Sequence, residues 1–158
     1  MPPPLRRRPL LGALLGGALA WPPAPANALP PRSLQFPRDH GAHPELRTEW
    51  WYVTGELQSG ARRLGFQVTF FRSRVDATQG MASAFAARQL VFAHAAVTDL
   101  AGGRLWHDQR IARAGFSIAQ AAQDDTRLRL RDWSLQRAAA GHYEAQVPAG
   151  EFALALRL

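Results

Sequence analysis

The chain has 158 residues, with 19 basic side chains, all arginine, against 12 acidic ones, and no cysteine. The lack of cysteine excludes disulfides, thiolate metal sites and cysteine nucleophiles. The formal charge of +7 falls to +4 without the three arginines of the first 28 residues. The remaining arginines are scattered among acidic residues, so the clustered cationic surface of a nucleic-acid-binding protein is not expected.

Residues 1–28 have the composition of an export signal. Arginines at positions 6 to 8 precede an apolar stretch from Leu10 to Trp21, and small residues close the segment. Because this stretch is shorter than the roughly 20 residues that span a bilayer, we interpret it as a cleaved signal peptide. The mature protein, residues 29–158, is then one domain that is periplasmic or secreted and has no integral membrane segment.

Beyond the leader, short segments of alternating apolar and polar residues predict β-strands. The clearest alternation is in residues 127–131, where two leucines point one way and three arginines the other. Turn residues at 58–60 and 101–103 predict hairpins between neighbouring strands. Only the alanine-rich segments 82–88 and 119–125 could be helical. The predicted strands are 47–57, 63–73, 88–99, 104–113, 115–119, 126–131, 134–137, 142–147 and 151–158.

This order of strands predicts an all-β fold, an antiparallel up-and-down barrel. The last segment, residues 152–158, places four apolar side chains on one face and has no polar tail. Natural proteins usually cover so apolar an edge. We therefore expect the chain to be truncated or the barrel to be incomplete at its C-terminus.

Four blocks of distinctive sequence occur in order along the chain. They are FPRDHGAHPE with EWWYVTGEL (36–45 and 49–57), GFQVTFFR (65–72), QLVFAHAAVTD (89–99) and DWSL (132–135). Together they resemble the carotenoid 1,2-hydratase, or AttH-type, family of lipocalin-like proteins. The resemblance covers residues 34–158 and is specific because the four blocks keep their order.

The resemblance implies a lipocalin-like barrel, the first of two such domains that pack together. An apolar small-molecule ligand, isoprenoid or lipid, is held in or between the domains, and no cofactor is implied. Members of the family include hydratases that add water to an isolated carbon–carbon double bond, and their proposed acid lies in the second half. The chain has no Gly-x-Ser-x-Gly motif, so nothing in it supports a serine hydrolase.

Hydration of an alkene needs a shielded proton donor and aromatic rings that stabilise a cation. Glu49 stands before three aromatic residues, Trp50, Trp51 and Tyr52. On a strand, Glu49 and Trp51 share one face, whereas Trp50 and Tyr52 share the other. In one interpretation Glu49 is a catalytic acid in a ligand cavity that Trp51 lines. In the other, the tryptophans plug the barrel and Glu49 pairs with an arginine such as Arg72.

The segment before the first strand contains Asp39, His40 and His43, which could be read as metal ligands. Their spacing in a loop lacks the geometry of a helical metal site, and no second cluster completes one, so no metal is expected. We expect Asp39 and His40 to bond the backbone of a turn and to hold this segment over the barrel mouth.

His94 is expected inside the barrel, either as a hydrogen-bonded interior histidine or as a polar group of the ligand cavity. The candidate ligand-binding residues are Trp50, Trp51, Tyr52, Phe70, Arg72 and His94. Three hypotheses for the function remain: a domain of an exported hydratase- or hydrolase-like protein, a barrel that binds an apolar ligand without transforming it, or an inactive fragment.

The arginines beside the apolar stretch fit a twin-arginine signal as well as an ordinary secretory signal. Replacing Arg7 and Arg8 by lysine is expected to stop export by the twin-arginine route and to leave ordinary secretion intact. Cell fractionation measures the exported fraction. Unchanged export would identify an ordinary secretory signal.

Overall fold

The computed structural model describes residues 31–158, and the predicted signal peptide lies outside these described residues. Residues Ser33–Leu158 form one packing unit. No helix in the described part of the chain is long and apolar enough to cross a membrane. The regular structure of residues 31–158 consists of strands and two short 3-10 turns.

The elements follow one another along the chain without long insertions, except for the segment between β2 and β3. The strands are β1 (Thr48–Ser59), β2 (Arg62–Arg74), β3 (Gln89–Asp99), β4 (Arg104–Arg113), β5 (Ala119–Ala121), β6 (Arg127–Leu130), β7 (Trp133–Arg137), β8 (Tyr143–Pro148) and β9 (Ala153–Arg157). The 3-10 turns are η1 (Arg38–His40) and η2 (Asp76–Thr78).

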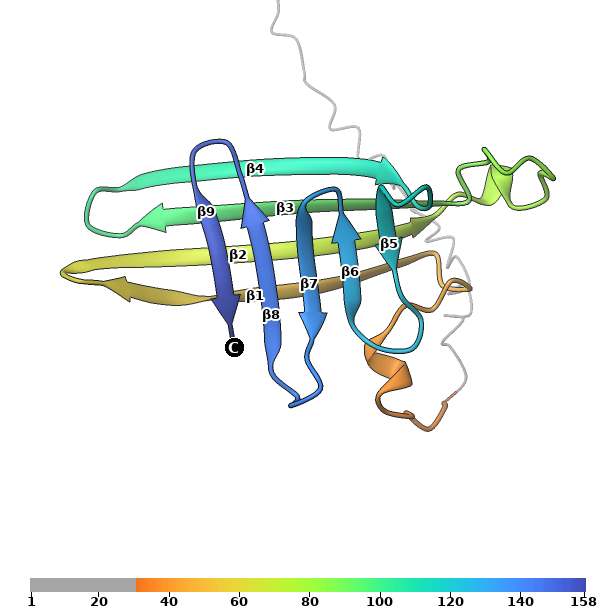
Figure 1. Ribbon diagram of the computed structural model, residues 1–158, viewed down its shortest axis with the longest axis horizontal. Coiled ribbons are helices and arrows are strands. Elements are labelled where there is room, and N and C mark those ends of the chain that lie inside the picture. The colour runs from red at the N-terminus through yellow and green to blue at the C-terminus, as the bar shows by residue number, and fades with distance from the viewer. Residues whose placement is uncertain (1–30) are drawn as a thin grey trace, which may run out of the picture. The chain divides into compact units, whose positions relative to one another are not determined.

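The strands form two antiparallel sheets, one in the order β1-β2-β3-β4 and the other in the order β5-β6-β7-β8-β9. Within each sheet every strand pairs with its neighbour in sequence, as the predicted up-and-down order requires. The two predicted hairpins are present, with Gly60 and Gly103 at a φ of 61° in their turns. Glycine adopts this left-handed conformation without the steric cost that a side chain would bring. Figure 1 shows the strands of the second sheet running across those of the first.

The all-β antiparallel fold is confirmed, but the sheets do not close into one barrel within residues 31–158. The chain turns a corner after β4 through Gly115, Phe116 and Ser117, all of which have positive φ. The predicted strand at 115–119 is therefore wrong, because these residues form the corner and β5 begins only at Ala119. Segments 82–88 and 119–125 are not helical.

The core lies between the two sheets. Leu128 and Leu130 are buried while the arginines that alternate with them are exposed, as the sequence predicted. Trp133 is fully buried and its Nε1 donates to the Pro148 carbonyl oxygen at 2.9 Å. A buried indole needs such a partner for its N–H. The Arg110 guanidinium lies 4.9 Å from the centroid of the same ring, so β4 of the first sheet also contacts Trp133.

Phe70 and Phe71 are neighbours on β2 that point to opposite faces of the first sheet. Phe70 is fully buried in the core, whereas Phe71 is half-buried on the outer face. We expect Phe70→Ala to lower the free energy of unfolding by about 3 to 5 kcal/mol, because it leaves a cavity in a packed core. Phe71→Ala should cost about 1 kcal/mol, because less apolar surface returns to water. Urea denaturation of both variants measures the difference, and equal losses would contradict the assignment of faces.

Candidate functional site

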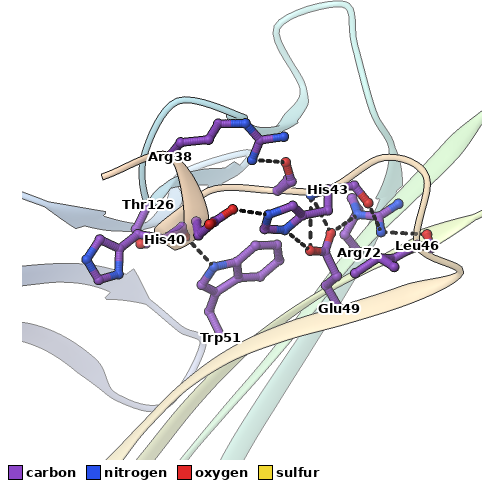
Figure 2. A network of polar contacts seen from close by, with 10 residues as sticks. Arg38, His40, His43, Leu46, Glu49, Trp51, Arg72 and Thr126 are labelled. Atoms are coloured by element: carbon purple, nitrogen blue, oxygen red, sulfur yellow. Dashed lines mark hydrogen bonds and ion pairs between the residues drawn. The ribbon is translucent and has the colours of Figure 1, made fainter. Parts of the chain in front are cut away.

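A polar network joins the segment before β1 to the first two strands (Figure 2). His43 lies at its centre, with Nδ1 2.7 Å from Glu49 Oε1 and Nε2 2.9 Å from Asp39 Oδ1. The backbone N–H of His43 also donates to the Glu49 carboxylate, at 2.8 Å to Oε2. Both ring nitrogens of His43 therefore face carboxylate oxygens.

Arg72 lies beneath this network and is completely buried. It stands opposite Glu49 in the register of β1 and β2, and its Nε donates to Glu49 Oε2 at 2.7 Å. Its Nη2 donates to the carbonyl oxygens of His43, at 2.9 Å, and Leu46, at 2.7 Å. A buried cation requires this compensation by a carboxylate and by carbonyl dipoles. Glu49 is therefore paired with Arg72, the pairing that the second interpretation of its role expected.

The network places acidic side chains beside an arginine and a histidine. Two carboxylates, of Asp39 and Glu49, face the Arg72 guanidinium and the His43 imidazole. Around Glu49, the backbone N–H of His43 and the Arg72 Nε donate to the carboxylate, and His43 Nδ1 lies 2.7 Å from Oε1. The Glu49 side chain thus ties the segment before β1 to Arg72 on β2.

The same segment is tied to the second sheet through its backbone. The carbonyl oxygen of His40 accepts hydrogen bonds from Trp51 Nε1 and from Thr126 Oγ1, both at 2.9 Å. The Ala42 N–H donates to the Ala122 carbonyl oxygen at 2.7 Å. Gly41 packs so closely that a Cβ atom there would lie 2.6 Å from the carbonyl oxygen of Gln123. The segment thus bridges β1 and the loop before β6.

Asp125, in that loop, forms a two-pronged ion pair with Arg137, at 2.9 Å from Nε and 2.6 Å from Nη2. These side-chain hydrogen bonds from Arg137 hold the pKa of the Asp125 carboxyl below its ordinary value. Because folding lowers this pKa, the pair stabilises the folded state above the pKa of the unfolded chain. That contribution is lost as the pH falls through the folded-state pKa.

Two adjoining cavities lie beside the network and share Trp51 and Tyr143. We call them together the Trp51–Tyr143 cleft. The first, of about 450 Å³, is lined mainly by polar residues, among them Asp39, His43 and Glu49. The second, of about 290 Å³, is lined mainly by apolar residues, which include Val53, Leu135 and Leu158. The cleft therefore has a polar end and an apolar end.

The structure divides the candidate residues of β1 between two faces. Glu49 and Trp51 are partly buried on the inner side, whereas Trp50 and Tyr52 are 59% and 62% exposed. This alternation confirms the predicted sharing of faces along the strand. Phe70 and Arg72 are buried on the inner side of β2 and line neither cavity of the cleft.

The prediction that His94 points into the interior is wrong. The buried residues of β3 are Val91, Ala93, Ala95 and Val97, which alternate with it. β3 contacts β5 and β6, so small side chains face the second sheet there. His94 lies on the outer face instead, with its ring 5.5 Å from that of Phe71.

Sequence reasoning missed Tyr143 and Thr126. The predicted strand at 142–147 contained Tyr143, but no local pattern indicated that it would line the same cavities as Trp51. In residues 31–158 no group of three or more His, Asp and Glu side chains is arranged to hold a metal ion. The cleft is thus built from hydrogen-bonding and apolar groups of the described chain.

Comparisons with known proteins bear on this geometry. A model of the family described as AttH-like matches residues 27–158. The crystal structure of an AttH-type protein from Nitrosomonas europaea is 44% identical over 81% of this chain, with a TM-score of 0.69. The chain spans 38% of the length of that protein. Among curated proteins no sequence matches. The two antiparallel sheets are consistent with a lipocalin-like fold.

Glu49→Gln tests the network against a matched change on the same strand. The substitution leaves the buried Arg72 without its counter-charge, so we expect a loss of about 3 to 5 kcal/mol in the free energy of unfolding. Glu56→Gln is the control, because Glu56 pairs with Arg63 at an exposed site where ion pairs contribute little. Chemical denaturation measures both variants. If Glu49→Gln were as stable as Glu56→Gln, the structural importance of the network would be refuted.

Proposed function

The chain belongs to the AttH-like family, and on this basis we propose that it is a lipocalin-like domain that binds an apolar ligand in the Trp51–Tyr143 cleft. The observation that carries the proposal is the joining of a polar and an apolar cavity at Trp51 and Tyr143. Ligand sites of proteins are concave, mostly apolar and equipped with a few polar groups that orient the ligand. The cleft has these properties.

The division of the cleft favours a class of ligand. A hydrocarbon chain would lie along Val53, Leu135 and Leu158, where burial of apolar surface drives binding. A hydroxyl or carboxyl group at one end of that chain would reach the polar cavity, where Thr126 and the Asp39–His43 pair lie. Isoprenoid alcohols and fatty acids have this combination of a long apolar part and one polar end.

Binding by this chain is favoured over hydration by this chain. A hydratase must deliver a proton to the double bond, and the Glu49 carboxylate is instead held by Arg72 and His43. The chain spans 38% of its solved relative. In a longer protein of the carotenoid 1,2-hydratase type, we would place the acid in a second lipocalin-like domain and the ligand-holding part in this one.

The proposal includes the compartment. The basic and apolar segments of residues 1–28 support export, and so a periplasmic or secreted protein. Apolar ligands outside the cytoplasm need a carrier or binding site, because water does not dissolve them. A domain with a cleft of this kind would meet that need.

The experiment measures saturable binding of a fluorescent naphthylamine probe and its displacement by farnesol or oleic acid. Val53→Glu places a charge in the apolar end of the cleft and should weaken binding at least about tenfold, because an unpaired charge is costly to bury. Thr54→Glu is the control, since Thr54 is exposed on the other face of β1.

Equal binding by the two variants would exclude the cleft as the site, and absence of saturable binding by the wild-type chain would exclude the binding function. Thermal unfolding of each variant checks that both remain folded. Loss of affinity in Val53→Glu alone supports the proposal.

A further inference from the structure

A group of apolar side chains is exposed at one end of the first sheet. Phe85 is 72% exposed and Phe116 is 52% exposed, and Met81 and Ile118 beside them are also exposed. Phe85 and Met81 belong to the segment between β2 and β3, which extends outward in Figure 1. Phe116 and Ile118 belong to the corner between β4 and β5. We call these four residues the apolar rim.

Specific contacts join the two segments into one surface. The rings of Phe85 and Phe116 stack with centroids 5.5 Å apart. The Arg113 guanidinium lies 4.2 Å from the centroid of the Phe116 ring and 5.6 Å from that of Phe85. Its Nη1 also donates to the Phe85 carbonyl oxygen at 2.6 Å. The Arg113 guanidinium therefore helps to hold the Phe85 and Phe116 rings in their solvent-exposed positions.

The backbone at Phe116 has a sterically unfavourable conformation that holds the side chain in this exposed position. Phe116 and Ser117 have φ values of 53° and 56°, in the left-handed region that residues with side chains rarely adopt. Strain of this kind concentrates at functional sites, where the surrounding structure maintains it. A large aromatic residue that is both strained and exposed has no role in stabilising the core.

The charge around the rim is mainly positive. Segments 75–89 and 113–121 contain Arg88 and Arg113, and their one acidic residue, Asp76, is paired with Arg74 at 3.2 Å. Arg129 adjoins them, because its Nη2 donates to the Ser117 carbonyl oxygen at 2.8 Å. Exposed aromatic and aliphatic side chains with arginines among them are complementary to a lipid surface. Such a surface has anionic headgroups on the outside and apolar chains beneath them.

We propose that the apolar rim docks on the surface of an anionic lipid bilayer. The phenylalanine rings enter the interfacial region while the arginines contact the lipid phosphates. This inference goes beyond the proposed function, since it assigns a surface by which the protein reaches lipid. It is independent of the Trp51–Tyr143 cleft, because the two share no residue.

The lack of native cysteine allows a site-specific test. The full chain carrying Phe85→Cys is labelled with an environment-sensitive fluorophore and mixed with vesicles of equimolar phosphatidylglycerol and phosphatidylcholine. We expect a blue shift and a rise in emission that high salt weakens. Leu105→Cys is the control, because Leu105 is 58% exposed at the beginning of β4, the end remote from the corner.

The position of the label separates the possible outcomes. Vesicle binding with no change at position 85, or with equal changes at 85 and 105, would overturn the proposal and assign binding to another part of the chain, such as residues 1–28. A change at position 85 that needs no vesicles and grows with protein concentration would overturn it in favour of self-association. Equal changes with vesicles of phosphatidylcholine alone would overturn the requirement for an anionic surface.

A second measurement does not depend on labelling. The double variant Phe85→Ser, Phe116→Ser should reduce partition into the anionic vesicles at least about tenfold, because two rings no longer enter the interface. Leu105→Ser should leave partition unchanged. Circular dichroism of both variants confirms folding, and unchanged partition of a folded double variant would refute the proposal.

Discussion

The buried charge of Arg72 constrains the whole polar end of this domain. A guanidinium that is removed from water must find a counter-charge and carbonyl oxygens, or the fold loses several kcal/mol. Here the counter-charge comes from Glu49 on the neighbouring strand, and the carbonyl oxygens come from His43 and Leu46 in the segment before it. The path of that segment is constrained because its carbonyl oxygens at His43 and Leu46 accept hydrogen bonds from the buried Arg72. Removal of the pair would leave the segment without its main internal attachment.

The position of the segment in turn fixes one wall of the cleft. The carbonyl oxygen of His40 accepts hydrogen bonds from the Trp51 indole N–H, on β1, and from the Thr126 hydroxyl, in the loop before β6. This shared acceptor holds the Trp51 ring where it lines both cavities of the cleft. Gly41 allows the close approach, because a side chain there would meet the backbone of the loop before β6. The polar network and the apolar cleft are thus parts of one arrangement.

The two proposed surfaces lie near the same end of the first sheet. The backbone N–H of Arg74 donates to the Arg47 carbonyl oxygen, and that of Val75 donates to the Arg88 carbonyl oxygen. These bonds place the beginning of β1, with the polar network, close to the base of the segment that carries Phe85. A domain that docks on lipid through this end would hold its cleft near the source of apolar ligands. Such proximity would give the proposed binding function a physical route for its ligand.

Much of the local structure could be predicted from the sequence. The alternation in residues 127–131 gave the correct inner and outer faces, as did the alternation of Glu49 and Trp51 with Trp50 and Tyr52. The hairpins at Gly60 and Gly103 were predicted from turn chemistry, which depends on a few adjacent residues. The pairing of Glu49 with Arg72 was one of two interpretations, since opposite charges on neighbouring strands satisfy each other.

The sequence by itself determined most of the strands, their order and most of their faces, because the two-residue period of a strand and the φ preferences of a turn are local properties. Only the tertiary structure decided that the sheets remain separate within residues 31–158, that Ala93 and Ala95 face inward while His94 faces outward, and that Trp51 and Tyr143 line the same cavities. These features depend on which strand crosses which and on how closely the sheets approach. Contacts between residues distant in sequence decide them, and no local pattern in the chain records those contacts.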